Sequence, residues 1–265
     1  MERVEFNHKT GKYLDVEGAN IYYEVIENAG KPALLFLHGG FGNIEDFNTI
    51  LPMLANDYHI VGIDSRGHGK STLGTDKITY KRLQLDVEAI VNHLQLKDLS
   101  IIGFSDGGTI AYRLTVSNNI SIKKIVTIGA RWSLSDAEIT EEEAANITPE
   151  EWIGYFEQNF DFYRKQNPSP DALKFTKCIL EMWVDKTADG FSDACVENIN
   201  VPVLAIRGND DTFSLESIVK FTSKVQNSIL FNIPFAPHKA FEKYPKFLVE
   251  VIRDFLNNGE NRRSL

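Results

Sequence analysis

A single serine stands among glycines in the segment GFSDGG, residues 103–108. Glycine allows sharp turns and close backbone contacts because it has no Cβ. The G-x-S-x-G pattern of residues 103–107 occurs by accident about one time in ten in a chain of this length. An apolar run precedes it and a helical pattern follows, which is the setting in which a strained turn exposes a nucleophilic serine. The segment therefore predicts that Ser105 is a nucleophile.

A serine hydroxyl becomes a good nucleophile only when a neighbouring base takes its proton, and histidine titrates in the right pH range. We predict that the base is His238, in the segment PFAPHKAF just after the last expected strand. A loop at that point reaches the carboxyl edge of an open sheet, where ligands bind. The alternative is a surface histidine that caps a helix. His38 and His68 lie in glycine-rich loops of their own.

A third group must orient the imidazole and stabilise its positive charge. The segment RGNDDTFS holds two carboxylates directly after an expected strand. We predict that Asp211 takes this role, and Asp210 is the alternative. The chain order serine, aspartate, histidine is the order expected with this type of serine turn.

The elements that must position these residues follow from apolar patterning. Alternating residues 12–18 and 19–27 predict a hairpin that turns at Gly18. Continuous apolar runs after it predict buried strands, and three- and four-residue spacing predicts helices between them. The expected strands are 33–38, 58–64, 99–104, 122–130, 201–208 and 228–234, and the expected helices are 45–55, 80–96, 107–116, 214–225 and 239–256. This alternation indicates a parallel sheet with crossover helices.

Residues 132–198 break the alternation, because they are acidic, rich in aromatic residues and helical in pattern throughout. We expect this insertion to form a helical cap over the site, while residues 1–131 and 199–265 form the core domain. Aromatic residues at helical spacing usually pack a core. Trp132 and Trp152 are the candidates for substrate contact among them.

Five segments together resemble the α/β-hydrolase fold family over nearly the whole chain. They are HGG (38–40), GIDSRGHGKS (62–71), the serine turn, VPVLAIRGNDD (201–211) and the PH pair (237–238). The resemblance implies an α/β fold with a mostly parallel eight-stranded sheet, helices on both faces and a helical cap insertion. It also implies that backbone N–H groups stabilise the oxyanion. One donor is that of Gly40 or Phe41 and the other is that of Asp106.

Asp106 and Arg131 depart from the common pattern and are candidates for substrate binding. A carboxylate at a helix N-terminus is stabilising in itself. Some relatives with a Ser-Asp-Gly-Gly turn resemble hydrolases of α-amino-acid esters, in which the aspartate holds the amino group. Arg131 follows the expected strand 122–130 and is placed to bind either a substrate carboxylate or an acidic residue of the insertion.

Composition excludes several other classes of protein. The formal charge is −9, and the one basic cluster is the terminal NRRSL, so we expect no nucleic-acid partner. Apolar runs are too short to span a bilayer, and the first residues lack an apolar signal segment. Cys178 and Cys195 suggest free thiols, which favours a cytoplasmic protein. His8, His59 and His93 show no metal-ligand spacing. We expect no metal, no cofactor and a monomer or homodimer.

The function predicted from these residues is hydrolysis of a small ester, thioester, lactone or amide by a serine nucleophile through an acyl-enzyme. Related C–C bond hydrolysis or a lyase step uses the same three residues and stays an alternative. A second alternative is a small-ligand receptor on the same fold that has lost catalysis.

Overall fold

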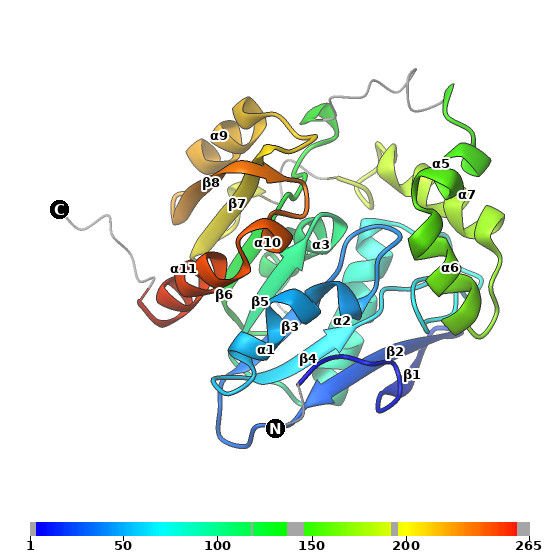
Figure 1. Cartoon of the computed structure of the whole chain (residues 1–265), viewed down its shortest axis with the longest axis horizontal. Coiled ribbons are helices and arrows are strands. Elements are labelled where there is room, and N and C mark those ends of the chain that lie inside the picture. The colour runs from blue at the N-terminus through cyan, green and yellow to red at the C-terminus, as the bar shows by residue number, and fades with distance from the viewer. Residues whose placement is uncertain (1–3, 118, 137–145, 192–195, 259–265) are drawn as a thin grey trace.

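The computed structural model describes residues 4–117, 119–136, 146–191 and 196–258, and within them an eight-stranded sheet forms the centre (Figure 1). Its spatial order is β1-β2-β4-β3-β5-β6-β7-β8. β1 and β2 form the predicted hairpin and β2 runs antiparallel to β4, whereas all later neighbours are parallel. The strands are β1 (Lys12–Val16), β2 (Ala19–Ile26), β3 (Ala33–Leu37), β4 (His59–Ile63), β5 (Leu99–Phe104), β6 (Ile122–Ile128), β7 (Val203–Asp210) and β8 (Ser228–Pro237).

Both faces of the sheet are covered by helices, which explains why the parallel strands are continuous apolar runs. Along β3, Leu35 and Leu37 point into one apolar core and Leu34 and Phe36 into the other. The first core is covered by α2 (Tyr80–His93), α3 (Asp106–Thr115) and α9 (Leu215–Lys224), and the second by α1 (Leu51–Leu54), α10 (Ala240–Lys243) and α11 (Pro245–Asn258).

Two of the predicted helices are each divided in the structure, and a proline lies at each division. The expected helix 45–55 is a 3₁₀ helix, η1 (Ile44–Thr49), followed by α1, with Pro52 in the first turn of α1. The expected helix 239–256 is α10 followed by α11, which begins at Pro245. Proline has no N–H to donate inside a helix but fits the first turn, so each helix restarts there.

Between β6 and β7 the described residues include a short 3₁₀ helix, η2 (Leu134–Asp136), and the helices α5 (Pro149–Tyr155), α6 (Glu157–Gln166) and α7 (Ala172–Trp183), which we call the cap helices. Rings of α6, of α7 and of Phe156, the residue between α5 and α6, lie near Phe41 in the loop after β3, at centroid distances of 5.2–5.7 Å. The cap helices therefore pack against the carboxyl end of the sheet, and Figure 1 shows them grouped on one side of the molecule.

Two further features bear on the sequence predictions. Cys178 on α7 is a free thiol, whereas Cys195 lies outside the described residues. Among the described residues, no helix has the length and apolar character needed to cross a bilayer.

Candidate active site

Ser105 occupies the sharp turn between β5 and α3, with φ 50° and ψ −119°. This left-handed conformation is strained for a residue with a side chain. The flanking glycines make the turn possible, since a Cβ on Gly103 would lie 2.5 Å from the Gly107 carbonyl oxygen. A Cβ on Gly107 would lie 2.0 Å from the Leu37 carbonyl oxygen. The two glycines of the motif are thus required by close backbone contacts rather than by flexibility.

The structure brings His238 and Asp211 together. Nδ1 of His238 lies 2.8 Å from Oδ1 of Asp211, and because an ionised carboxylate only accepts, the imidazole donates. Asp211 is buried and also accepts a hydrogen bond from the Phe213 N–H at 3.3 Å. The ring of Phe104, the residue before Ser105, lies 4.9 Å from the imidazole. The predicted base therefore lies beside the serine turn, with its Nδ1 tautomer fixed by Asp211.

Gly129, directly after β6, packs against this histidine–aspartate pair. A Cβ on Gly129 would lie 2.8 Å from both Cε1 and Nδ1 of His238 and 3.0 Å from Oδ2 of Asp211. Its φ is +57°, which glycine adopts freely. Nothing in the sequence marks Gly129 as a site residue, because the pattern around it is that of an ordinary strand end.

The loop after β3 lies against the serine turn from another side. A Cβ on Gly39 would lie 2.9 Å from the Cβ of Ser105. His38 fixes this loop, since its Nδ1 lies 2.7 Å from the Gly39 oxygen and its Nε2 accepts from the Ser65 N–H at 2.9 Å. Phe41 has φ 56°. Within the described ranges, the backbone N–H groups of Gly40, Phe41 and Asp106 donate no hydrogen bond, so all three are free to bind an anion.

Asp106 is a buried acceptor at the start of α3. The Tyr80 hydroxyl donates to Oδ1 at 2.7 Å, and Nε1 of Trp183 lies 2.9 Å from Oδ2 and 3.1 Å from Oδ1. Burial raises the pKa of the Asp106 carboxyl, although these two donors, Arg131 and His238 act in the opposite direction. Sequence reasoning missed Tyr80 because its spacing on α2 is that of a core residue.

Arg131 and Trp132, shortly after β6, both contact other parts of the chain. Arg131 places its guanidinium 4.4 Å from the centre of the Phe191 ring and donates to the Leu134 carbonyl at 3.3 Å, while its buried Nε has no partner in the described part of the chain. It forms no ion pair with an acidic residue among the residues described. Trp132 is buried and donates to the Ser217 carbonyl and hydroxyl on α9. These contacts make Trp132 a packing residue.

Trp152 lies on α5 within the aromatic contacts of the cap helices. Its ring stacks on Phe156 at 5.9 Å and meets Trp183 edge to face at 5.4 Å. It contacts Asp106 only through Trp183, and its buried Nε1 has no partner in the described residues. In those same residues no group of three or more histidine, cysteine, aspartate or glutamate side chains is arranged to hold a metal ion.

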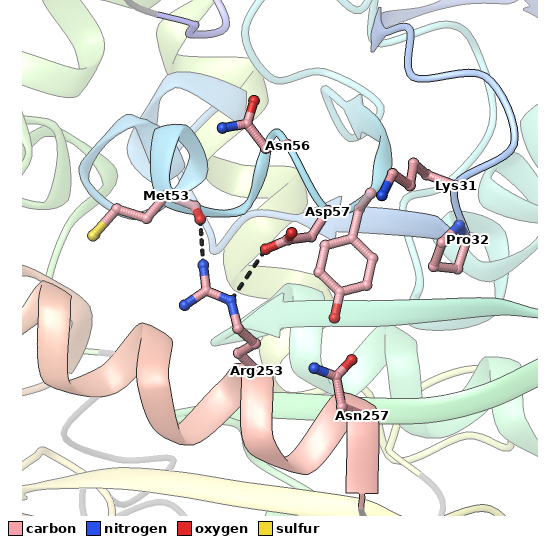
Figure 2. A pocket seen from close by; sticks show the side chains of 8 residues that line it. Lys31, Pro32, Met53, Asn56, Asp57, Arg253 and Asn257 are labelled. Atoms are coloured by element: carbon pink, nitrogen blue, oxygen red, sulfur yellow. Dashed lines mark hydrogen bonds and ion pairs between the residues drawn. The ribbon is translucent and has the colours of Figure 1, made fainter.

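A surface pocket lies at the amino ends of the strands, at the end of the sheet away from Ser105. Its volume is about 570 Å³. Figure 2 shows the residues that line it, between α1 and α11 and next to the amino end of β3. Arg253 spans it, with hydrogen bonds to Asp57 at 3.1 Å and to the Met53 carbonyl at 2.6 Å. Its lining includes none of the predicted site residues.

A mostly parallel sheet with a strained serine between strand and helix, and a histidine–aspartate pair at the same edge, defines the class of α/β hydrolases. Comparison with known proteins agrees: the family model described as alpha/beta hydrolase fold matches residues 32–176, and the chain belongs to that family.

Two relatives that match most of the chain carry the names of hydrolases. The chain is 25% identical over 267 residues to the hydrolase YugF of Bacillus subtilis, covering 91% of this chain and 96% of that one. It is 26% identical over 253 residues to the bifunctional esterase/perhydrolase DCH of Acinetobacter calcoaceticus, with 84% and 90% covered. The solved esterase EaEST of Exiguobacterium antarcticum superimposes with a TM-score of 0.77 at 19% identity, covering 94% and 100%. The comparisons therefore support a hydrolase.

Proposed function

We propose that this protein is a serine hydrolase of small carboxylic esters. Ser105 is the nucleophile, His238 the general base and Asp211 the residue that orients the imidazole. The backbone N–H group of Asp106 and that of Gly40 or Phe41 form the oxyanion hole. The observation that carries the proposal is the 2.8 Å hydrogen bond between Asp211 and His238, formed beside the strained turn that holds Ser105.

The chemistry follows from this arrangement. Asp211 holds the proton of His238 on Nδ1, so Nε2 is the nitrogen that takes the Ser105 proton. The Ser105 oxygen attacks the ester carbonyl carbon, and the carbonyl electrons move onto the oxyanion, which the two N–H groups stabilise. His238 returns the proton to the departing alcohol. Water, activated by the same histidine, then hydrolyses the acyl-enzyme and restores Ser105.

Several observations favour esters over other acyl compounds as substrates. The relative from Acinetobacter calcoaceticus and the solved structure from Exiguobacterium antarcticum are both named as esterases. Aromatic rings of the cap helices gather around Phe41, beside the serine turn. Apolar surroundings of this kind suit an uncharged acyl group, because burying an unpaired charge there is costly. We infer that short acyl esters without a charge near the carbonyl are preferred.

A fluorophosphonate probe and p-nitrophenyl acetate and butyrate test the proposal. We expect the probe to label the wild-type protein and the esters to be hydrolysed. Ser105→Ala should abolish both, while Ser223→Ala, at an exposed position on α9, should change neither. A folded wild-type protein that neither takes the probe nor hydrolyses any ester would contradict the proposal and favour the receptor alternative. Labelling that persists in Ser105→Ala would contradict the assignment of the nucleophile.

A further inference from the structure

One side chain of the cap helices contacts both segments of the proposed oxyanion hole, the loop at Gly40 and Phe41 and the turn at Asp106. The Trp183 ring meets the Phe41 ring edge to face, with centroids 5.4 Å apart, and its Nε1 lies 2.9 Å from Oδ2 of Asp106. A Cβ on Gly40, between the two, would lie 2.7 Å from Asp106 Oδ2 and 2.8 Å from Cζ2 of Trp183. The indole is therefore packed directly onto the loop and the turn that carry the two N–H donors.

A second cap side chain holds the same loop through its backbone. Nδ2 of Asn159, on α6, donates to the Phe41 carbonyl oxygen at 3.1 Å. The Phe41 ring is enclosed further by rings of the cap helices, with centroids at 5.2, 5.2 and 5.7 Å, contributed by Phe156, Phe160 and Phe175.

This enclosure matters because Phe41 has φ 56°, a conformation that residues with a side chain adopt only when the surroundings enforce it. The Phe41 carbonyl accepts a hydrogen bond from a cap helix, and the Phe41 ring packs against rings of the cap. These contacts therefore help to hold Phe41 in its strained conformation.

We propose that Trp183 and Asn159 are positioning residues for the oxyanion hole. Asn159 fixes the peptide planes around Phe41, and Trp183 fixes Asp106 against the same loop, so both N–H groups are directed at one point. This inference rests on the proposed function. The cap helices then do more than cover the site, because the geometry that stabilises the oxyanion depends on their being docked.

A positioning role and a packing role have different kinetic signatures. Oxyanion donors act mainly on the charge that develops in the transition state, so misplacing them lowers kcat and leaves KM nearly unchanged. Loss of packing that shapes the substrate pocket raises KM instead. An alkylboronic acid, which forms a tetrahedral adduct with a serine oxygen, reports on the same donors in a stable complex.

The test compares Trp183→Phe, which keeps an aromatic ring but removes the N–H that reaches Asp106, with Asn159→Leu, which removes the bond to the Phe41 carbonyl. Tyr155→Phe and Gln158→Leu are matched controls, since both residues are exposed on or next to the same cap helices. We expect each test variant to lower kcat on the order of 10-fold and to raise the boronic acid Ki by a similar factor. KM should change less than about 3-fold. The controls should match the wild type.

The results that would reject the positioning role can be told apart from those that would reject the proposed function. Unchanged kcat and Ki in both Trp183→Phe and Asn159→Leu overturn it, as does a rise in KM with kcat preserved. Fluorophosphonate labelling of Ser105 in the wild type is measured beside these assays. Its absence would mean that the proposed function itself fails, whereas labelling with unaffected variants rejects only the positioning role. The two variants act on different residues, so one that fails to fold leaves the other as the test.

Discussion

Nδ1 of His238 donates to Oδ1 of Asp211 at 2.8 Å, although 27 positions separate the two residues in the chain. The pairing of β7 with β8 produces this contact, because their parallel register places Asp210 opposite Pro237. Asp211 and His238, which directly follow these two residues, therefore leave the two strands side by side. The register of this pairing shifts between Gly208 and Asp210, just before Asp211. The geometry of the pair is thus a consequence of strand register at the sheet edge.

Replacing Asp211 by asparagine should remove the acceptor that fixes the His238 tautomer. We expect Asp211→Asn to lower kcat by about 10³–10⁴-fold with little change in KM, because the imidazole then presents the wrong nitrogen to Ser105. Steady-state ester hydrolysis measures the change, and circular dichroism checks that the variant folds.

The neighbouring carboxylate provides a matched comparison for that variant. Asp210 is exposed, and its Oδ1 accepts a hydrogen bond from Nδ2 of Asn209. Asp210→Asn should therefore retain close to wild-type kcat. If Asp210→Asn proved as inactive as Asp211→Asn, the assignment of the orienting acid would have to be revised.

A methyl group at Gly129 should displace the histidine–aspartate pair. The added Cβ would lie 2.8 Å from the His238 ring, and φ +57° costs about 1–2 kcal/mol for an L-residue. We expect Gly129→Ala to lower kcat/KM on the order of 10–100-fold and to lower the melting temperature. Gly154→Ala on α5 is the control, because its Cβ would meet nothing within 4 Å. Equal activity in the two variants would contradict the close packing.

The stability of the fold should fall as pH rises toward 9, because of His8. This buried imidazole lies 2.6 Å from Oε1 of Glu45 and 2.8 Å from Oδ2 of Asp64. Burial by itself lowers the His8 pKa, but the hydrogen bonds to the two carboxylates raise it more, to about 9. The folded-state pKa thus exceeds the ordinary value of 6.5, so the stabilisation is complete below pH 6.5 and is lost as pH rises through about 9.

Chemical denaturation at pH 6.5 and pH 10 measures this effect. The His8 contribution to the free energy of unfolding should decrease by about 3 kcal/mol between them. His8→Gln should remove this part of the pH dependence, whereas His93→Gln, at an exposed position on α2, should keep it. The same pH dependence in His8→Gln and the wild type would refute the role of His8.

The contacts of Asp106 decide between two roles for its carboxylate. Tyr80 and Trp183 already donate to both oxygens, and the side chain is buried, so we expect no separate role in holding a substrate ammonium. Asp106→Asn should therefore slow hydrolysis of a valine ester and of its des-amino analogue by similar factors, within about 3-fold. The measurement is kcat/KM on the matched esters. A much larger loss on the valine ester would establish amino-group recognition instead.

Local signals in the sequence were sufficient for the fold class and for a proposal of the nucleophile, base and acid. Continuous apolar runs predicted the parallel strands, and glycines 103 and 107 predicted a sharp turn that carries Ser105. Apolar spacing predicted two continuous helices, each of which the structure divides near a proline, Pro52 or Pro245. Spacing could not predict these divisions, because it does not depend on the N–H that proline lacks. These predictions depend on neighbours along the chain.

Tertiary structure alone decided which side chains support the site. Four residues reach Asp106, Phe41 and His238 from distant elements, and no local sequence pattern marks them for this role: Tyr80, Trp183, Asn159 and Gly129. A buried polar group is satisfied by whatever donor the fold brings near, and that proximity is not encoded by spacing. The sequence by itself therefore determined the fold and the proposed nucleophile, base and acid, while the folded chain determined what positions them.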